Sequence, residues 1–399
     1  MMELTGYLRS DGRKGIRNLV VVVYLVECAH HVAREITWPL REGGVHLIGF
    51  PGCYPNNYAY KMVENISTHP NVGAVLLVSL GCESFARQKL AASIKKTGRP
   101  VETLVIQENG GTRTTIDAGR AWVEKTRAEL DKQQRVPMGI NELVVGTICG
   151  GSDATSGLTA NPAIGLTFDQ LVQEGATCIF EETGELIGCE QHLARRSLTP
   201  ELGQEVVASI DKARICYDAL GHGSFANGNA EGELTTQEEK SMGAYAKSGS
   251  GTLHGLIQPG DLPPRGGLYL LDVVPDGEVS FGFPNIVDNA EIGELIACGC
   301  HLILFSTGRG SVVGSAVSPV IKICGNPETF ERLSDDMDLD AGAILTGATT
   351  LPAVGAALHT MVLDVVAGKA TRSEELCHQE FILTYKSFEP QGPSCLPSF

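Results

Sequence analysis

The sequence lacks the features that would place this protein in a membrane or on a nucleic acid. No apolar run reaches transmembrane length, since the stretch NLVVVVYLVECAHHV breaks into Glu and His. Basic residues are in the minority: 31 Lys and Arg stand against 47 Asp and Glu, and the formal net charge is −16. Such a chain repels nucleic acids and anionic membrane surfaces, so we expect neither as a partner.

Three further absences narrow the function. The N-terminal sequence MMELTGYLRSDGRKG is polar and shows no signal peptide, so we expect a cytoplasmic protein whose 12 cysteines stay reduced. CxxC spacing is missing, which argues against a zinc ribbon. The first predicted strand runs into YLVECAHHVA rather than G-x-G-x-x-G, which argues against a dinucleotide-binding dehydrogenase.

Aromatic residues are scarce, at 6%, whereas glycine is abundant, with 47 residues. This balance suits the many tight turns of a parallel sheet. Apolar β-branched runs alternate with helical segments twice along the chain, which predicts an α/β protein with two doubly wound, mostly parallel sheet domains and helices on both faces. We place the N-terminal domain at residues 1–134. The C-terminal domain, residues 135–399, carries a long Gly/Asn-rich loop at 221–233 that we interpret as an active-site loop.

The pattern also predicts individual elements. In the first domain the strands cover 18–28, 45–50, 74–80 and 101–107, and the helices cover 29–36, 57–66, 84–96 and 116–131. In the second domain the strands cover 142–148, 177–181, 268–273, 301–305 and 319–323, and the helices cover 161–173, 185–196, 200–219 and a segment from 236. Residues 247–266 are rich in Gly and Pro, and we expect them to be irregular.

Three cysteines each end an apolar run beside a glycine: Cys53 in VHLIGFPGC, Cys82 in AVLLVSLGC and Cys149 in ELVVGTICGG. Ligands of open α/β sheets bind just beyond the carboxyl ends of strands, so these soft ligands stand where such a fold places its chemistry. Together they predict a metal centre, most naturally iron, either as a three-Cys iron–sulfur cluster or as a mononuclear site completed by oxygen ligands. The alternative is three small buried residues, because free cysteine is often buried.

Two glycine-containing loops at strand ends suit an anionic substrate. ENGGTRTT places Gly111, Thr112 and Arg113 at the start of a helix, where backbone amides and a guanidinium can hold a carboxylate. FSTGRGS repeats the arrangement with Thr307 and Arg309. The alternative is that both arginines form structural salt bridges.

Acidic residues follow three of the predicted strands. Glu83 either stabilises a helix start or acts as a metal ligand or base. Ser152 and Asp153 follow Cys149; the aspartate either binds metal or a substrate hydroxyl, or caps a turn. The segment EETGE, which ends at Glu185, places several carboxylates close together. Either this segment caps the next helix, or the neighbouring carboxylates raise the pKa of one of them and make it a general base. Near the Gly/Asn-rich loop, which includes Asn229, Lys240 is an acid/base or an anion clamp.

Seven segments, in order, resemble the signatures of the altronate and galactarate dehydratase family: GYLRSDGRKGIRN, HPNVGAVLLVSLGCE, QENGGTRTTIDAG, CGGSDATSGLTANPAIG, ELTTQEEKSMGAYAKSG, FSTGRGS and VIKICGN. The resemblance implies a lyase that removes the proton α to a carboxylate and expels a β substituent with the help of iron or another divalent metal. It makes Lys240, Lys247 and Glu185 the candidate proton carriers.

The sequence departs from the family pattern in two places. Sugar-acid members carry a small extra N-terminal domain, whereas here the sequence begins at the large part, like the large subunit of the family's sulfolactate sulfo-lyase. FPGCYPNNYA also replaces a His-containing pattern, which fits a changed leaving group. We therefore expect β-elimination of sulfite from (2R)-3-sulfolactate to give pyruvate, by an oligomer that includes a small partner subunit. The alternatives are a sugar-acid dehydratase, a non-catalytic subunit and a nucleotide-binding α/β protein.

Overall fold

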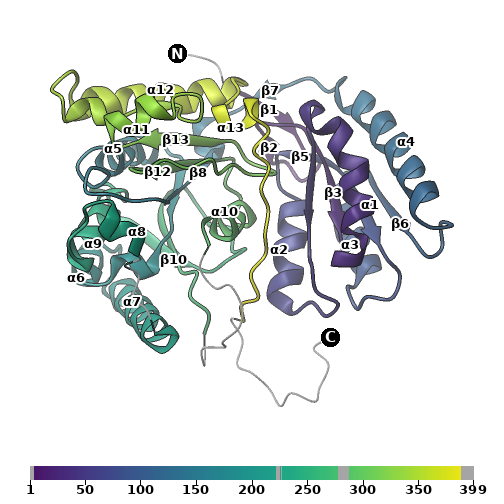
Figure 1. Cartoon of the computed structure of the whole chain (residues 1–399), viewed down its shortest axis with the longest axis horizontal. Helices are drawn as coiled ribbons and strands as arrows, with labels where there is room; N and C mark the ends of the chain where they lie inside the picture. Colours follow the sequence, from purple (N-terminus) through teal and green to yellow (C-terminus); the bar gives the residue numbers. More distant parts are fainter. Residues whose placement is uncertain (1–3, 222–224, 226, 277–286, 388–399) are drawn as a thin grey trace.

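The computed structural model describes residues 4–221, 225, 227–276 and 287–387, and it contains two parallel β-sheets with helices packed around them (Figure 1). Every strand pair within these two sheets is parallel. The predicted α/β class is therefore confirmed. No helix in the described part of the chain is long and apolar enough to span a membrane.

The first sheet has the strand order β4-β3-β5-β6 and is apolar on both faces because helices cover both. Its strands are β3 (Leu19–Tyr24), β4 (Val45–Gly49), β5 (Val72–Ser79) and β6 (Val101–Val105). One face packs against α1 (Glu27–Thr37) and α4 (Thr112–Leu130), and the other against α2 (Asn57–Ser67) and α3 (Arg87–Lys96). The 3-10 helix η1 (Trp38–Gly43) connects α1 to β4.

The second sheet has the order β10-β11-β9-β8-β12-β13-β14. Its strands are β8 (Val144–Cys149), β9 (Thr177–Phe180), β10 (Leu253–Ile257), β11 (Gly267–Leu271), β12 (Leu302–Thr307), β13 (Val320–Cys324) and β14 (Leu339–Asp340). Helices α5 (Ala160–Gln173) and α12 (Leu351–Ala367) cover one face, and α10 (Asp288–Ala297) covers the other.

The connection from β9 to β10 is mostly helical. It contains η3 (Thr183–Leu186), α6 (Glu190–Arg195), α7 (Pro200–Leu220), α8 (Asn227–Glu231) and α9 (Gln237–Ala246). The single helix predicted at 185–196 is wrong, because the chain turns at Gly188, whose φ is +93°, and restarts as α6. The irregular segment predicted at 247–266 contains β10, and residues 222–224 and 226 of the predicted active-site loop lie outside the described residues.

The two sheets share one apolar core rather than standing apart. Helix α2 of the first sheet packs against α10 of the second, and buried side chains continue from Val23 and Leu77 to Ile148 and Phe305. A small antiparallel sheet, β2-β1-β7, also joins them; its strands are β1 (Thr5–Leu8), β2 (Lys14–Gly15) and β7 (Val136–Pro137). The remaining elements are η2 (Ile140–Glu142), α11 (Pro327–Arg332), η4 (Gly342–Ile344) and α13 (Arg372–Glu375). After α13 the chain descends between the two sheets (Figure 1).

Candidate active site

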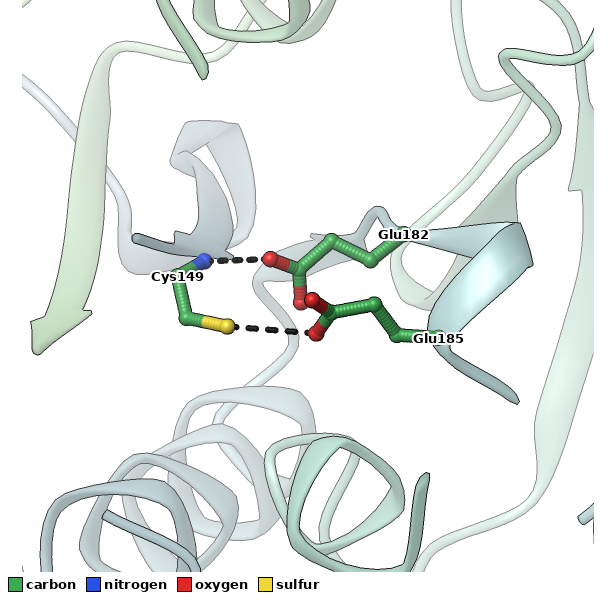
Figure 2. Close-up of side chains that lie close together, drawn as sticks. All are labelled: Cys149, Glu182 and Glu185. Carbon is green, nitrogen blue, oxygen red and sulfur yellow. Dashed lines mark hydrogen bonds between the residues drawn. The ribbon is translucent and has the colours of Figure 1, made fainter. Parts of the chain in front are cut away.

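The candidate site lies at the carboxyl ends of the neighbouring strands β8 and β9. The register pairs Thr147 of β8 with Phe180 of β9, so the residues that follow these two positions leave the sheet side by side. Strand β8 ends at Cys149, and β9 runs into Glu181 and Glu182. The following η3 carries Glu185 back toward the cysteine (Figure 2).

These residues form a compact group of candidate ligands. Within the described residues, ligand atoms of Cys149, Glu182 and Glu185 all lie within 4.8 Å of one another. The Cys149 backbone N–H donates to Glu182 Oε1 over 2.7 Å, and its thiol donates to Glu185 Oε2 over 3.2 Å (Figure 2). Glu182 has a φ of +95°, a left-handed conformation that costs a non-glycine residue about 1–3 kcal/mol. Such strain is typical of functional positions.

Two buried lysines balance the two carboxylates. Lys240 Nζ lies 2.6 Å from Glu185, and Lys247 forms an ion pair with Glu182. Lys240 also donates to the side chain of Asn229 over 3.2 Å. Helix α9 supplies the first lysine and ends at the second, which explains why the two stand together at the triad.

A ring of polar contacts closes around the thiol. Asn229 donates to the carbonyl oxygen of Ser152 over 3.4 Å, and the hydroxyl of Ser152 lies 3.1 Å from Cys149 Sγ. The ring therefore runs from Ser152 through Cys149, Glu185, Lys240 and Asn229 back to Ser152. It brings together five of the residues that the sequence singled out.

The electrostatics of the site follow from its burial. Burial, together with the Glu185 carboxylate, raises the pKa of the Cys149 thiol to about 11. Burial by itself would lower the pKa of Lys240, but the ion pair with Glu185 outweighs it and raises that pKa. In the structure as it stands, the thiol therefore keeps its proton and Lys240 is charged.

Two cavities adjoin the group, and they differ in character. One, of about 340 Å³, is lined by Cys149, Glu185 and Lys240 together with the polar Ser152 and Asp153 and the apolar Leu158 and Met242. The other, of about 70 Å³, is lined on the triad side by Cys149, Glu181, Glu182 and Glu185, and on the α10 side by Asp288 and Glu291. The first cavity has the size and mixed lining of a small-molecule site.

The smaller cavity concentrates buried acids. Burial and the neighbouring Glu185 raise the pKa of Asp288 to about 6, and burial raises the pKa of Glu291 to about 8. Glu181 is 1% exposed, and neither of its carboxylate oxygens has a hydrogen-bond partner. Such groups mark functional sites more often than structural ones.

The donor set fits a divalent transition metal. One sulfur and two carboxylates suit iron, zinc or manganese better than calcium, which prefers oxygen ligands only. The unpartnered oxygens of Glu181 and the excess of acids beside the triad also leave room for added positive charge. Cys149, Glu182 and Glu185 are therefore a candidate metal-binding triad.

The predicted three-cysteine centre is not formed in this structure. Cys53 and Cys82 are exposed and do not belong to the triad. The reason is topological: they follow β4 and β5 of the first sheet, whereas Cys149 follows β8 of the second. Cys53 and Cys82 therefore stand at the edge of a different sheet, and the ligand atoms beside Cys149 are those of Glu182 and Glu185.

Glu83 holds its own loop. It accepts hydrogen bonds from the Ser79 hydroxyl and from the Gly81 backbone N–H. Burial would raise the pKa of Glu83, but these hydrogen bonds prevail and lower it. Glu83 therefore stabilises the loop after β5 and is not a member of the triad. It does not cap a helix start either, because α3 begins at Arg87 without a side-chain cap.

The predicted anion loops lie outside both cavities. Gly111 precedes the first turn of α4, with a φ of +91°, but Thr112 and Arg113 are exposed and line neither cavity. Thr307 and Arg309 contact the loop after Cys149, yet the guanidinium pairs with Glu231 at 3.1 Å and donates to the Gly228 carbonyl at 2.7 Å.

Asp153 lies in the lining of the larger cavity but is occupied by its own turn. Its Oδ1 accepts hydrogen bonds from the backbone N–H and hydroxyl groups of Thr155 and Ser156. Its Oδ2 accepts one from Asn326 over 3.2 Å. The turn-capping alternative is thus realised.

Sequence reasoning missed Glu181, Glu182, Asp288 and Glu291 as site residues. The first two belong to EETGE, whose stacked carboxylates were a visible signal. Asp288 and Glu291 had no such signal, because DNAEIGELIA has the composition of an ordinary helix. The position of the Asp288 carboxylate depends on the glycine at position 150. A Cβ atom on residue 150 would lie only 2.1 Å from Asp288 Oδ2.

Comparison with known proteins places these features in a family. Residues 140–388 match the model of the D-galactarate/altronate dehydratase C-terminal domain, and residues 6–131 match the second domain of D-galactarate dehydratase/altronate hydrolase. The chain is 32% identical to the (2R)-sulfolactate sulfo-lyase subunit beta of Chromohalobacter salexigens, over 95% of this chain and 96% of that one. It is 28% identical to the altronate dehydratase of Escherichia coli, over 93% and 75% of the two chains. Against the galactarate dehydratase (L-threo-forming) of Escherichia coli it is 33% identical, over 77% and 59%. The chain belongs to the D-galactarate/altronate dehydratase family.

Proposed function

We propose that this protein is a metal-dependent lyase that catalyses β-elimination from a small 2-hydroxy acid, with (2R)-3-sulfolactate as substrate and pyruvate and sulfite as products. The lyase class follows from the family, whose named relatives are a sulfo-lyase and dehydratases. The observation that carries the proposal is the triad with its two lysines beside the cavity of about 340 Å³. The chain's match to nearly the whole length of the sulfo-lyase subunit supports the choice of substrate.

The side chains have distinct tasks in this proposal. Cys149, Glu182 and Glu185 would hold the metal, which we propose to be iron; when bound, it supplies positive charge that favours loss of the C2 proton. A cytoplasmic, reducing location would keep Cys149 available as a ligand. Lys240 is charged at neutral pH because its pKa is raised, so it suits binding of the substrate carboxylate or proton donation. Glu185 is the candidate for accepting the C2 proton, and Lys247, an ammonium group paired with Glu182, is the candidate for returning a proton at C3.

The electron count of the reaction is simple. The C2–H pair becomes the C2=C3 double bond as the proton moves to the base, and the C3–S bond breaks with its electron pair leaving on sulfite. The enol then takes a proton at C3 and loses its hydroxyl proton, which gives pyruvate. Chain residues therefore need to accept one proton at C2 and return one at C3, while the hydroxyl proton leaves with sulfite as hydrogen sulfite.

A sugar-acid dehydratase is the second candidate, and one observation favours it. The larger cavity is lined by Asp153, Glu185 and Glu239 but by one cation, Lys240, among the described residues. Carboxylates accept hydrogen bonds from sugar hydroxyls, whereas they repel a sulfonate. An altronate or galactarate chain would find more partners in this lining than sulfolactate would.

We also propose that the active enzyme contains a small partner subunit. The sulfo-lyase relative is a subunit beta, and the family describes residues 6–131 of this chain as a second domain. A first domain supplied by a separate chain would complete the family arrangement. The active form would then be a hetero-oligomer.

An anaerobic assay tests the function. The chain is purified without metal, alone and with a small-subunit candidate, and loaded with Fe²⁺. Sulfite and pyruvate are measured with sulfolactate, and the 2-oxo acid is measured with altronate and galactarate. Iron-dependent release of sulfite supports the proposal. Turnover of a sugar acid alone moves the assignment to the dehydratases, and iron-independent turnover contradicts the role of the triad.

A further inference from the structure

A fully buried lysine near the C-terminal end of the described chain has no place in the proposed chemistry. The side chain of Lys386 is 1% exposed, and it lies in the segment that descends between the two sheets after α13 (Figure 1). Burying an ammonium group is costly unless it is paired and hydrogen-bonded. Its surroundings therefore indicate what it does.

Lys386 joins three parts of the molecule. Its ammonium group contacts both carboxylate oxygens of Glu294 on α10, each at 2.9 Å. The phenol of Tyr58, on α2 of the first sheet, donates to the same carboxylate over 2.5 Å. Asn56, which caps α2, donates to the backbone carbonyl of Lys386 over 2.6 Å. The terminal segment, the first sheet and α10 are thus tied at one carboxylate.

Helix α10 carries this contact to the candidate site. Asp288, Glu291 and Glu294 follow one another at a spacing of three residues, which keeps them on neighbouring parts of one helix face. Asp288 and Glu291 line the acidic cavity beside Cys149, whereas Glu294 pairs with Lys386. A shift or rotation of α10 would move the cavity wall and the Lys386 contact together.

The buried acids around Lys386 explain why its contact with Glu294 affects the position of α10. Glu294 is 0% exposed, and Glu291 one turn away is also buried. The Lys386 ammonium pairs with Glu294 and favours the ionised form of Glu291 and Glu181, although burial still raises the pKa of both. Without Lys386, α10 would carry buried acids with their main counter-charge removed, and moving the helix toward water would relieve them.

We propose that Lys386 is a positioning residue of the candidate site: through Glu294 it sets the place of α10, and so of the Asp288 and Glu291 wall that faces the metal-binding triad. The inference deepens the proposed function because it concerns the same site. It also predicts that the first sheet supports the site through Tyr58, although that sheet contributes no residue to the triad.

The test compares Lys386→Met with Lys61→Met. Lys61 is a matched control because it also pairs with an acid, Asp261, between the two sheet regions at 2.7 Å, but with side chains about half exposed (43% and 47%). One readout is hydrogen exchange of residues 288–297, measured where circular dichroism shows both variants folded. The other is Co²⁺ binding to the metal-free chain, followed by the thiolate-to-cobalt absorption. Neither readout needs a substrate.

We expect Lys386→Met to exchange at 288–297 at least tenfold faster and to bind Co²⁺ at least tenfold more weakly, and Lys61→Met to match the wild type. Adding Glu294→Gln to Lys386→Met removes the unpaired acid, and recovery of Co²⁺ binding would support action through Glu294. If Lys386→Met fails to fold, Tyr58→Phe should show a smaller change in the same direction.

Wild-type exchange and Co²⁺ binding in Lys386→Met would overturn the proposal, as would equal losses in Lys61→Met. If the wild type itself binds no Co²⁺, the metal part of the proposed function fails, and the exchange at 288–297 alone decides the role of Lys386.

Discussion

The two sheets of this protein are both parallel and flanked by helices, but they differ in the burial of the side chains at their carboxyl edges. In the first sheet the loops after β4 and β5 carry Cys53 and Cys82, and the first turn of α4 after β6 carries Arg113; all three are exposed. In the second sheet β8 ends at Cys149 and the segment after β9 carries Glu181 and Glu182; all three are buried. Similar sequence signals therefore ended in opposite environments.

The arrangements that reduce folding stability are concentrated at the carboxyl edge of the second sheet. Around the second sheet, lysines neutralise buried carboxylates, Glu182 holds a strained backbone and Glu181 lacks hydrogen-bond partners. Each of these features costs stability, so a purely structural edge would not need them. In the first sheet the buried acid Glu83 is fully used within its own loop. These features make the carboxyl edge of the second sheet the candidate site of the chemistry.

The largest difference between the two edges is expected when their cysteines are replaced by serine, one at a time. Cys149→Ser should reduce kcat/KM by about a thousandfold, equivalent to about 4 kcal/mol, because it removes the sulfur ligand. Cys53→Ser and Cys82→Ser should stay within about twofold of wild type, because surface substitutions change little. Parallel measurement of bound iron and activity checks the expectation. Equal losses in all three variants would restore the three-cysteine centre.

Removing a counter-charge should affect stability more at the second edge than at the first. Lys247→Met leaves the Glu182 carboxylate buried without its ion pair, and breaking a buried pair costs about 3–5 kcal/mol. Arg113→Met, at the exposed first edge, should cost at most about 0.5 kcal/mol. Urea unfolding followed by circular dichroism measures both. A small cost for Lys247→Met would mean that water reaches Glu182.

The buried acids of the smaller cavity should make the stability of the protein decrease as pH rises. Because burial raises the pKa of Glu291 from 4.5 to about 8, the stability that this residue contributes is fully present below pH 4.5 and is lost as pH rises through about 8. Glu291→Gln does not titrate, so its melting temperature should rise relative to that of the wild type between pH 5 and pH 9. A difference between the two proteins that stays constant with pH would show that Glu291 is solvated.

The smallest effect is expected at the two anion loops. Arg309 already pairs with Glu231, and exposed ion pairs contribute less than about 1 kcal/mol, so Arg309→Lys should lower kcat/KM by less than about fivefold. Arg113→Lys should have no measurable effect. Steady-state kinetics with sulfolactate and with altronate checks both. A loss of ten- to a hundredfold in either variant would mean that its guanidinium turns to the substrate during catalysis.

The sequence by itself determined the family, the α/β class and the position of most strands. Buried parallel strands such as LVVVVY and VGAVLLVS are apolar throughout, and this signal is local, so it survives without tertiary information. The placement of Cys149, Glu185 and Lys240 in the candidate site was predictable for the same reason, since each follows a strand end or lies beside a Gly-rich loop.

Only the tertiary structure decided which of these residues meet. Strand order puts β8 beside β9 and sets Cys53 and Cys82 in another sheet, and no local pattern encodes that order. Asp288 and Glu291 read as ordinary helix residues, and their burial against the cavity depends on where α10 packs. Lys386 lies 92 residues from Glu294 and is paired with it by the path of the chain between the sheets. The chemistry of a buried charge depends on its neighbours in space, which the fold assembles from distant parts of the sequence.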